Sequence, residues 1–140
     1  MLSDTEYQEL ATFRFQIRSF LNFSEEAALE AGVEPRQHQA LLAVKAISIE
    51  EPCTIGSIAN QLFLQHQSAV GLVNRLESRG LVARQAAPED ARQVIVRLTA
   101  KGEKTLHTLS IAHRAELEQR APELARALRA IMRRTKRNAA

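Results

Sequence analysis

The chain is poor in the residues that mark secreted, membrane-spanning or disordered proteins. Its 140 residues include one cysteine, no tryptophan, one tyrosine, four prolines and five glycines. A single cysteine cannot form an internal disulfide, which agrees with a reducing compartment. The low content of proline and glycine does not demand disorder. We find neither a signal peptide nor an apolar run of about 18 residues, so we expect a soluble cytoplasmic protein that does not bind membranes.

The sequence also lacks a group of residues that suits catalysis or metal binding. No nucleophile is matched with a base, so we predict that the chain is not an enzyme. Glu103 and His107 share a helical face, but two ligands do not make a site, and we expect no metal and no cofactor. Metal sensing stays open as an alternative. Redox sensing by Cys53 is another, although a reactive thiol needs a nearby cation and Cys53 has no basic neighbour.

Length and composition indicate one globular domain, since 45% of the residues are hydrophobic and 25% are charged. The net charge of +3 is unevenly distributed along the chain. Residues 1–34 carry seven acids against two arginines, whereas residues 65–101 carry six cations against three acids. The last fifteen residues hold six cations and no acid. A polyanion would therefore meet the centre and the tail of the chain.

The stretch from Thr54 to Thr99 organises the rest of the chain. Its first part has apolar residues at the spacing of one buried helical face, namely Ile55, Ile58, Ala59, Leu62 and Phe63. After a turn over residues 64–66, a second helix is expected to begin at Gln67. Its apolar side comprises Ala69, Val70, Leu72, Val73 and Leu76, and its polar side comprises Gln67, Ser68, Gly71, Asn74, Arg75 and Ser78. The polar side holds no acid, although an ordinary solvated face would look the same.

A hairpin is predicted after this second helix. Gly80 suits the end of the helix, and strands are expected over residues 81–85 and 94–98, with Val94, Val96 and Leu98 on one face. Residues 86–92 form a polar tip, and residues 53–55 are expected to add a small third strand. Thr99 suits the N-cap of the next helix. The predicted fold class is therefore mainly α with a small β-hairpin wing (α+β), a winged helix-turn-helix.

Helices are expected on both sides of this stretch, over residues 3–31, 35–48, 100–120 and 123–136, with Pro122 as an interruption. Phe15 and Phe23 leave the main apolar stripe of the first helix, so that helix needs a second neighbour, most simply another copy of the chain. We therefore predict a single domain, residues 1–140. Within it, residues 33–99 form the winged helix-turn-helix lobe, and residues 1–32 and 100–140 form dimerisation helices.

Short motifs in the central stretch resemble those of the MarR (multiple antibiotic resistance regulator) family. They are Ser68-Ala-Val70, Asn74-Arg75-Leu76-Glu77, Arg79-Gly80-Leu81-Val82 and Arg84, followed by the wing pattern Asp90-x-Arg92-x-x-x-Val96-x-Leu98-Thr99-x-x-Gly102. The resemblance implies a homodimeric repressor that leaves a pseudo-palindromic double-stranded DNA operator when a small effector binds. A redox- or metal-responsive regulator of the same fold and a winged helix that binds proteins stay open as alternatives.

Residues of the second helix and of the hairpin are the predicted DNA contacts. The set comprises Gln65, His66, Gln67, Ser68, Gly71, Asn74, Arg75, Arg84, Asp90 and Arg92. Glutamine and arginine side chains can bond base edges, and Gly71 lets the backbone approach DNA. The resemblance implies that Arg92 enters the minor groove and that Asp90 holds a nearby arginine. Arg84 and Arg97 are expected either to touch phosphates or to face water.

The resemblance also implies a small aromatic or carboxylate-bearing effector. The residues expected to line its cleft are Phe13, Arg14, Ile17, Arg18, Phe20, His38 and Leu41. Ordinary core packing explains the apolar members of this set equally well.

Overall fold

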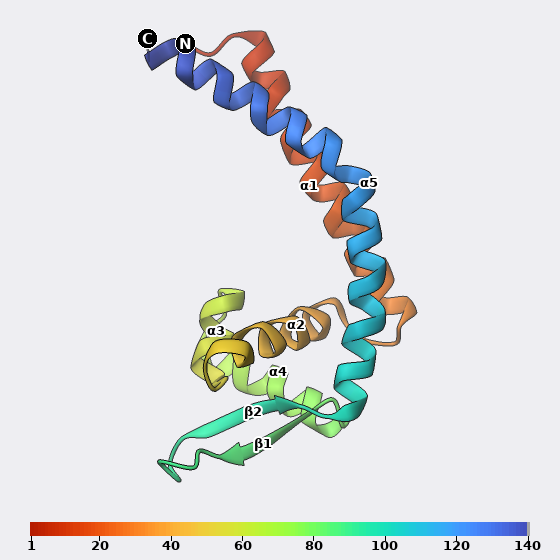
Figure 1. Ribbon diagram of the computed structural model, residues 1–140, viewed down its shortest axis with the longest axis vertical. Helices are drawn as coiled ribbons and strands as arrows, with labels where there is room; N and C mark the ends of the chain where they lie inside the picture. The colour runs from red at the N-terminus through yellow and green to blue at the C-terminus, as the bar shows by residue number, and fades with distance from the viewer. Residues whose placement is uncertain (140) are drawn as a thin grey trace. The chain divides into compact units, whose positions relative to one another are not determined.

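The computed structural model describes residues 1–139, which fall into two compact units (Figure 1). The central unit holds residues 28–110, and the terminal unit holds residues 1–27 together with the chain from residue 111 onward. The elements in order are α1 (Asp4–Glu30), α2 (Pro35–Glu50), α3 (Ile55–Leu62), α4 (His66–Ser78), β1 (Val82–Ala86), β2 (Val94–Leu98) and α5 (Ala100–Ala139). The predicted mainly helical winged helix-turn-helix is therefore confirmed. No helix within the described residues is long and apolar enough to span a membrane.

Local side-chain bonds set the helix boundaries of the central unit. At the start of α3, the Thr54 hydroxyl accepts a hydrogen bond from the Ser57 N–H at 3.1 Å, and the Thr54 N–H donates to the Ser57 hydroxyl at 2.9 Å. This reciprocal pair satisfies two backbone donors that the helix leaves free. Helix α2 begins at Pro35 and ends at Glu50, two residues later than predicted. It ends there because Pro52 disfavours a helical conformation at Glu51, whose backbone is extended.

The wing is a two-stranded antiparallel hairpin in which Val82 lies opposite Leu98 and Ala86 lies opposite Val94. Strand β2 has the predicted bounds, and β1 is shifted by one residue. Helices α2, α3 and α4 contact the hairpin from one side (Figure 1). Val96 is fully buried against them, whereas Val94, at the outer end of the same face, is 38% exposed. The predicted apolar face of β2 is thus covered only where the helices reach it.

The predicted third strand over residues 53–55 is wrong for the described part of the chain. The sheet contains β1 and β2 alone, because Thr54 is already the N-cap of α3 and Ile55 is its first residue. One backbone hydrogen bond remains from the expected pairing, in which the Val96 N–H donates to the Cys53 carbonyl at 2.8 Å. This single bond joins the segment before α3 to the wing.

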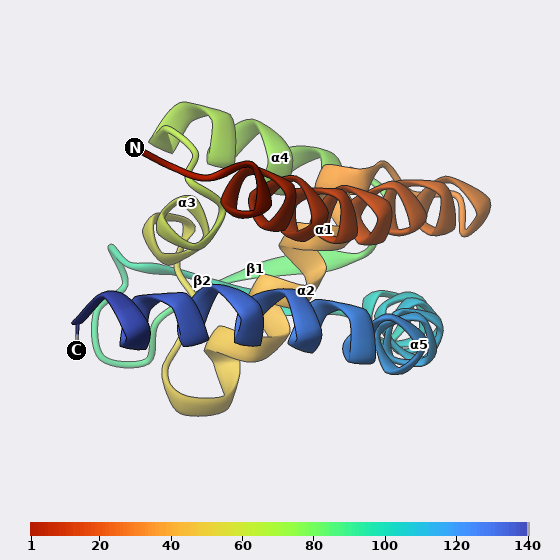
Figure 2. The same ribbon diagram turned by 90° about the horizontal axis from the view of Figure 1, so that it is seen from above.

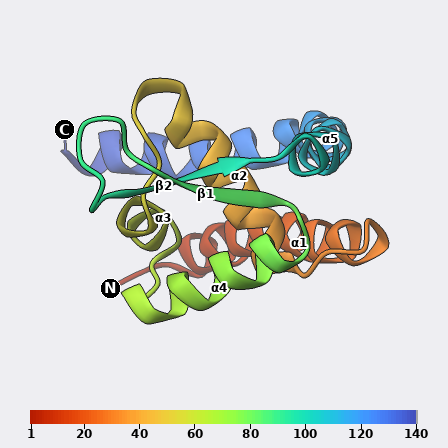
Figure 3. The same cartoon turned by 90° about the horizontal axis from the view of Figure 1, so that it is seen from below.

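The core of the central unit forms where the two helices of the helix-turn-helix pack on α2 and the hairpin. Helices α3 and α4 lie next to one another in both end views (Figure 2, Figure 3). Fully buried apolar side chains come from every element around them, namely Leu41, Val44, Ile58, Leu72, Val73, Leu76, Leu81, Val82 and Val96. The apolar side predicted for α4 is therefore the one that packs into the core.

The prediction that Phe63 belongs to the buried face of α3 is wrong. The helix ends at Leu62, and Phe63 takes a left-handed conformation with φ 54° and ψ 44°. Its side chain is 97% exposed. Helical spacing predicted burial only on the assumption that the helix continued through this residue.

The predicted interruption at Pro122 is also wrong, since α5 runs from Ala100 to Ala139 with this proline inside it. A proline inside a helix costs about 3 kcal/mol, because it removes one backbone bond and clashes with the carbonyl four residues earlier. The helix nevertheless continues on both sides. In the terminal unit, Phe20 and Phe23 of α1 pack edge-on against His113 of α5, with ring centroids 5.8 and 5.5 Å away.

Candidate nucleic-acid interface

Helix α4 presents one buried and one exposed side, as its sequence predicted. Ala69, Leu72, Val73 and Leu76 are fully buried. The polar residues on the other side are exposed, namely Gln67, Ser68, Asn74, Arg75 and Ser78, whereas Gly71 is only half-buried. The chain therefore offers an open polar helix face that carries no acid before Glu77.

The N-terminus of α4 is not capped by the side chain of its N-cap residue. The helix begins at His66, one residue earlier than predicted, because Gln65 is extended and serves as the N-cap. Within the described residues, the Gln65 side chain makes no capping bond, and the first turn contains no acid. Unsatisfied N–H groups and the helix dipole give such an end a partial positive charge that suits a phosphate.

Strand β1 is tied to α4 by Arg84, which sequence reasoning treated as a DNA contact or a solvated side chain. Its guanidinium donates to the Glu77 carboxylate at 2.7 Å and to the Asn74 side-chain oxygen at 2.6 Å. The Arg84 backbone N–H donates to the other Glu77 oxygen at 3.2 Å. Glu77 belongs to the motif singled out in the sequence, but its spacing from Arg84 did not predict this bond. The contact fixes the wing against α4.

The tip of the wing is shaped by Asp90. Its carboxylate accepts a hydrogen bond from the Arg92 backbone N–H at 3.0 Å, and its carbonyl accepts one from the Gln93 N–H, also at 3.0 Å. The Ala87 N–H donates to the Gln93 carbonyl at 2.9 Å, which closes the loop. The Arg92 side chain is 97% exposed and lies 3.8 Å from Asp90 through its Nε. Asp90 thus holds the loop backbone while the Arg92 guanidinium stays open to a partner.

The C-terminal end of α4 is anchored by bonds that the sequence did not predict. The Arg79 guanidinium donates to the Gln37 side-chain oxygen at 2.7 Å and to the Gly32 carbonyl. The Lys101 ammonium donates to the Arg79 carbonyl at 2.8 Å. Arg79 and Gln37 are 42 residues apart, so no local pattern could have shown this pairing.

Helix α5 begins against the same end of α4. The Thr99 hydroxyl donates to the Gly80 carbonyl at 2.5 Å and accepts from the Gly102 N–H at 3.0 Å. A side chain at Gly102 would place its Cβ 2.0 Å from the Leu81 carbonyl oxygen. Glycine at this position lets the first turn of α5 contact the backbone that follows α4.

The predicted effector residues are divided between the two units. Phe13, Arg14, Ile17 and Arg18 line a groove of about 600 Å³ on α1, together with Leu10 and Leu21. Phe20 contacts His113 instead. His38 and Leu41 lie in the core of the central unit, where they are 4% and 0% exposed. All six lining residues of the groove come from one helix, so the groove is an open helix face.

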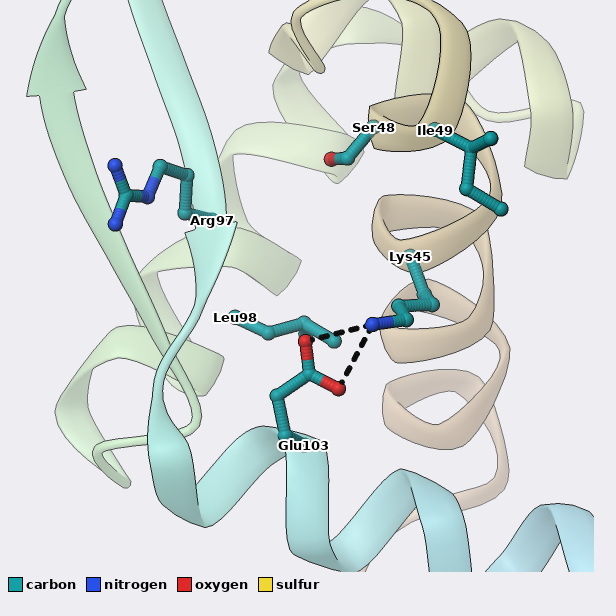
Figure 4. A pocket seen from close by; sticks show the side chains of 6 residues that line it. All are labelled: Lys45, Ser48, Ile49, Arg97, Leu98 and Glu103. Carbon is teal, nitrogen blue, oxygen red and sulfur yellow. Dashed lines mark hydrogen bonds and ion pairs between the residues drawn. The ribbon is translucent and has the colours of Figure 1, made fainter.

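A second cavity, of about 310 Å³, lies in the central unit between α2, β2 and the start of α5 (Figure 4). Lys45 and Glu103 cross it, with the ammonium 3.0 and 3.1 Å from the two carboxylate oxygens. Arg97 lies at its rim and donates to the Gln85 side chain at 3.0 Å. Both partners of the ion pair are about half exposed, so the pair joins α2 to α5 without a large energetic contribution.

Cys53 does not have the surroundings of a redox sensor. The side chain is fully buried. Burial raises the pKa of the thiol, more than the hydrogen bond from Ser57 lowers it, and the nearby Glu51 raises it further. A reactive cysteine needs the opposite, an exposed thiol with a lowered pKa. Within the described residues, no three His, Cys, Asp or Glu side chains come together as a metal site.

The order of elements, the open face of α4 and the hairpin tip define a winged helix-turn-helix of the kind found in transcription regulators. Residues 31–93 match the family model described as the MarR family. The resemblance seen in the sequence is therefore confirmed, and the winged helix of this chain is of the MarR type. Members of that family are transcription regulators. No curated protein sequence matches the chain.

Solved structures share the fold over most of the chain. CouR from Rhodococcus jostii RHA1, bound to p-coumaroyl-CoA, is 23% identical with a TM-score of 0.68, over 86% of this chain and 83% of that one. A point mutant of S. aureus MepR, bound to an oligodeoxyribonucleotide, is 18% identical with a TM-score of 0.67, over 99% and 100%. AbsC from Streptomyces coelicolor is 20% identical with a TM-score of 0.71, over 97% of each chain.

Proposed function

We propose that this chain is a sequence-specific DNA-binding regulator whose α4 enters the major groove. The observation that carries the proposal is the exposed polar side of α4, which holds no acid before Glu77. An α-helix of about 10–12 Å diameter fits a major groove about 12 Å wide. Residues 65–68 at its open end would contact base edges or phosphates. Farther along the helix, Arg75 would bond guanine or phosphate.

Arg92 would reach the minor groove from the tip of the wing. Its side chain is almost fully exposed, and Asp90 fixes the loop that carries it. A narrow, A·T-rich minor groove concentrates negative potential and attracts such an arginine. Arg84 would hold the wing in position against α4, because its guanidinium already donates hydrogen bonds to Glu77 and Asn74.

The terminal unit would join two copies of the chain. Within its described residues, only His113 and Ala127 are buried. Large apolar side chains on both of its helices are exposed instead, namely Leu10, Phe15, Ile17 and Leu21 on α1 and Ile111, Leu117, Leu128 and Met132 on α5. A unit with so small a core needs further apolar burial to be stable. A second copy supplies it most simply.

A two-fold dimer would present two recognition helices to one face of DNA, about one helical turn apart, which predicts a pseudo-palindromic operator. We propose that the regulator represses and that an effector releases it. The MepR relative is bound to an oligodeoxyribonucleotide and the CouR relative to p-coumaroyl-CoA. In this chain, Arg14 and Arg18 beside Phe13 would suit a small aromatic or carboxylate effector. Such a ligand acts only if it favours one spacing of the two lobes over the other.

A winged helix that binds proteins is the second candidate, since the exposed face of α4 does not by itself distinguish DNA from an acidic protein surface. Salt dependence separates the two. DNA binding through several cations makes log K fall linearly with log salt, because condensed counterions are released.

Selection from random duplex DNA tests the proposal. The purified chain should enrich duplexes that share a two-fold motif, and Arg75→Ala should lower affinity for the selected duplex or relax its base preference. Gln119→Ala is a matched control, because Gln119 is an exposed residue of α5 outside the proposed interface. Recovery of no duplex at low ionic strength would refute the proposal.

A further inference from the structure

Phe63 combines two unfavourable features in the turn between α3 and α4. Its backbone is left-handed, with φ 54°, and its phenyl ring is 97% exposed. The Leu64 N–H donates to the Ala59 carbonyl at 2.9 Å and thereby closes the helix end over this residue. Positive φ is disfavoured for bulky side chains, because Cβ approaches the following carbonyl.

Two other helices of this chain are followed by a glycine, which adopts positive φ without a steric penalty. Gly32, after α1, has φ 80°, and Gly80, after α4, has φ 72°. Phe63 is the one non-glycine residue with positive φ among those the structure describes. The phenyl ring contributes little to the core and makes the turn harder to form. Residues held in such strained backbone conformations cluster at functional sites.

The position of Phe63 indicates what it contacts. Three peptide units separate it from His66, so the two Cα atoms lie at most about 11 Å apart. Exposed polar residues follow Phe63 in this turn and in the first turn of α4, namely Gln65, His66, Gln67 and Ser68. The N-terminal residues of a recognition helix are the ones that reach base edges. The exposed ring therefore lies close along the chain to the proposed base contacts.

We propose that Phe63 packs on the 5-methyl group of a thymine in the major groove, at one position of each half-site. This inference rests on the proposed DNA-binding function. The thymine methyl is the apolar group that the major groove displays, and phenylalanine is among the side chains that contact it. Phe63 would thus add an apolar base contact to an interface whose other proposed contacts are hydrogen bonds from α4.

Replacement of single thymines by deoxyuridine tests this contact, since deoxyuridine lacks only the methyl group. The probe is the duplex selected by the wild-type chain, with each thymine replaced in turn. Wild-type affinity should fall about three- to tenfold at one thymine per half-site. Phe63→Ala should bind the unmodified duplex more weakly by a similar factor and should lose the response to deoxyuridine at that thymine. Ile49→Ala, which removes another large exposed side chain of the central unit, should behave as wild type.

The outcomes separate this inference from the function on which it rests. If the wild type binds a selected duplex and Phe63→Ala shows the same affinity and the same deoxyuridine profile, the inference is wrong and the proposed function stands. If Phe63→Ala weakens the dimer in sedimentation, the ring is a subunit contact and the inference is again wrong. If no duplex is selected, both proposals fall. Thermal unfolding of the variant should match the wild type, which excludes a loss of fold.

Discussion

The Arg84 guanidinium of β1 lies 2.7 Å from the carboxylate of Glu77, the second-to-last residue of α4. The Asn74 side chain accepts a second bond from the same guanidinium. Helix α4 and the first strand of the wing are therefore joined by these side-chain bonds as well as by packing. If both enter DNA, this link sets the distance between the major-groove and minor-groove contacts.

Glu77→Gln should weaken operator binding more than it weakens the fold. The Arg84 and Glu77 side chains are 25% and 43% exposed, so loss of the ion pair should cost less than about 1 kcal/mol of unfolding free energy. Operator affinity should fall several-fold, because the wing is held less firmly against α4 once the ion pair is lost. Urea unfolding and gel-shift titration measure the two effects.

Glu103→Gln is the matched control for that change. It removes another partly exposed ion pair, between Lys45 of α2 and Glu103 of α5, that does not involve α4 or the wing. Its unfolding free energy should fall by a similar small amount and its operator affinity should not change. Equal affinity losses in the two variants would mean that the Glu77–Arg84 link has no special part in binding.

Arg92→Ala should lower operator affinity about tenfold without changing thermal stability. The side chain is 97% exposed, so the fold loses almost nothing. Loss of one cation from the interface should also reduce the slope of log K against log salt by about one. Arg114→Ala removes an arginine of α5 that is 84% exposed, and its salt slope should match wild type. An unchanged slope in Arg92→Ala would take the wing tip out of the interface.

Gly102→Ala should destabilise the central unit by more than about 2 kcal/mol. The added Cβ would lie 2.0 Å from the Leu81 carbonyl oxygen, which is backbone and cannot turn aside. Gly56→Ala is the control, since the nearest atom to its Cβ is the Thr54 hydroxyl oxygen at 3.7 Å. Alanine favours a helix over glycine by up to about 1 kcal/mol, so this control should be as stable as wild type or more so. Urea unfolding distinguishes the two.

Leu10→Asp combined with Leu21→Asp should convert a dimer into a monomer. Both side chains line the open groove of α1 and are about half exposed, so the charges would be tolerated in a single chain but not within an apolar interface. Sedimentation equilibrium measures the change. Ile49→Asp, at an exposed site of α2, should leave the assembly intact. A double variant that sediments as the wild type does would place the interface elsewhere.

Phe63→Gly should melt at a temperature no lower than that of the wild type. Glycine removes the left-handed strain, which is about 1–2 kcal/mol for an ordinary residue, and this gain offsets its greater freedom in the unfolded chain. The 97% exposed ring contributes little burial that could be lost. A clear fall in melting temperature would show that the ring stabilises the fold after all.

Features of the fold that depend on residues close together in the chain were predicted from apolar spacing and from glycine positions. The apolar spacing of α4 identified its buried side, and Gly80 marked the end of α4, where it takes positive φ. Periodicity failed at Phe63, because it cannot show that a helix stops one residue before its last apolar position. Proline rules failed at Pro122, because a 40-residue helix retains enough bonds on either side to continue.

The parts of the site that sequence reasoning missed depend on contacts distant in the chain. The bond between Arg79 and Gln37 spans 42 residues, and a charged residue near a helix end is ordinarily read as solvated. Arg84 was expected to face DNA or water because its two partners on α4 come into reach only when the hairpin folds back. In the structure its guanidinium donates to Glu77 and Asn74.

The composition of the complex with a duplex selected from random DNA tests the central claim most directly. Sedimentation of the chain with that duplex should give a complex of two chains with one duplex. The selected sequences should share a two-fold motif with half-sites about 10 base pairs apart. A single chain per duplex, or selected sequences without two-fold symmetry, would contradict the account.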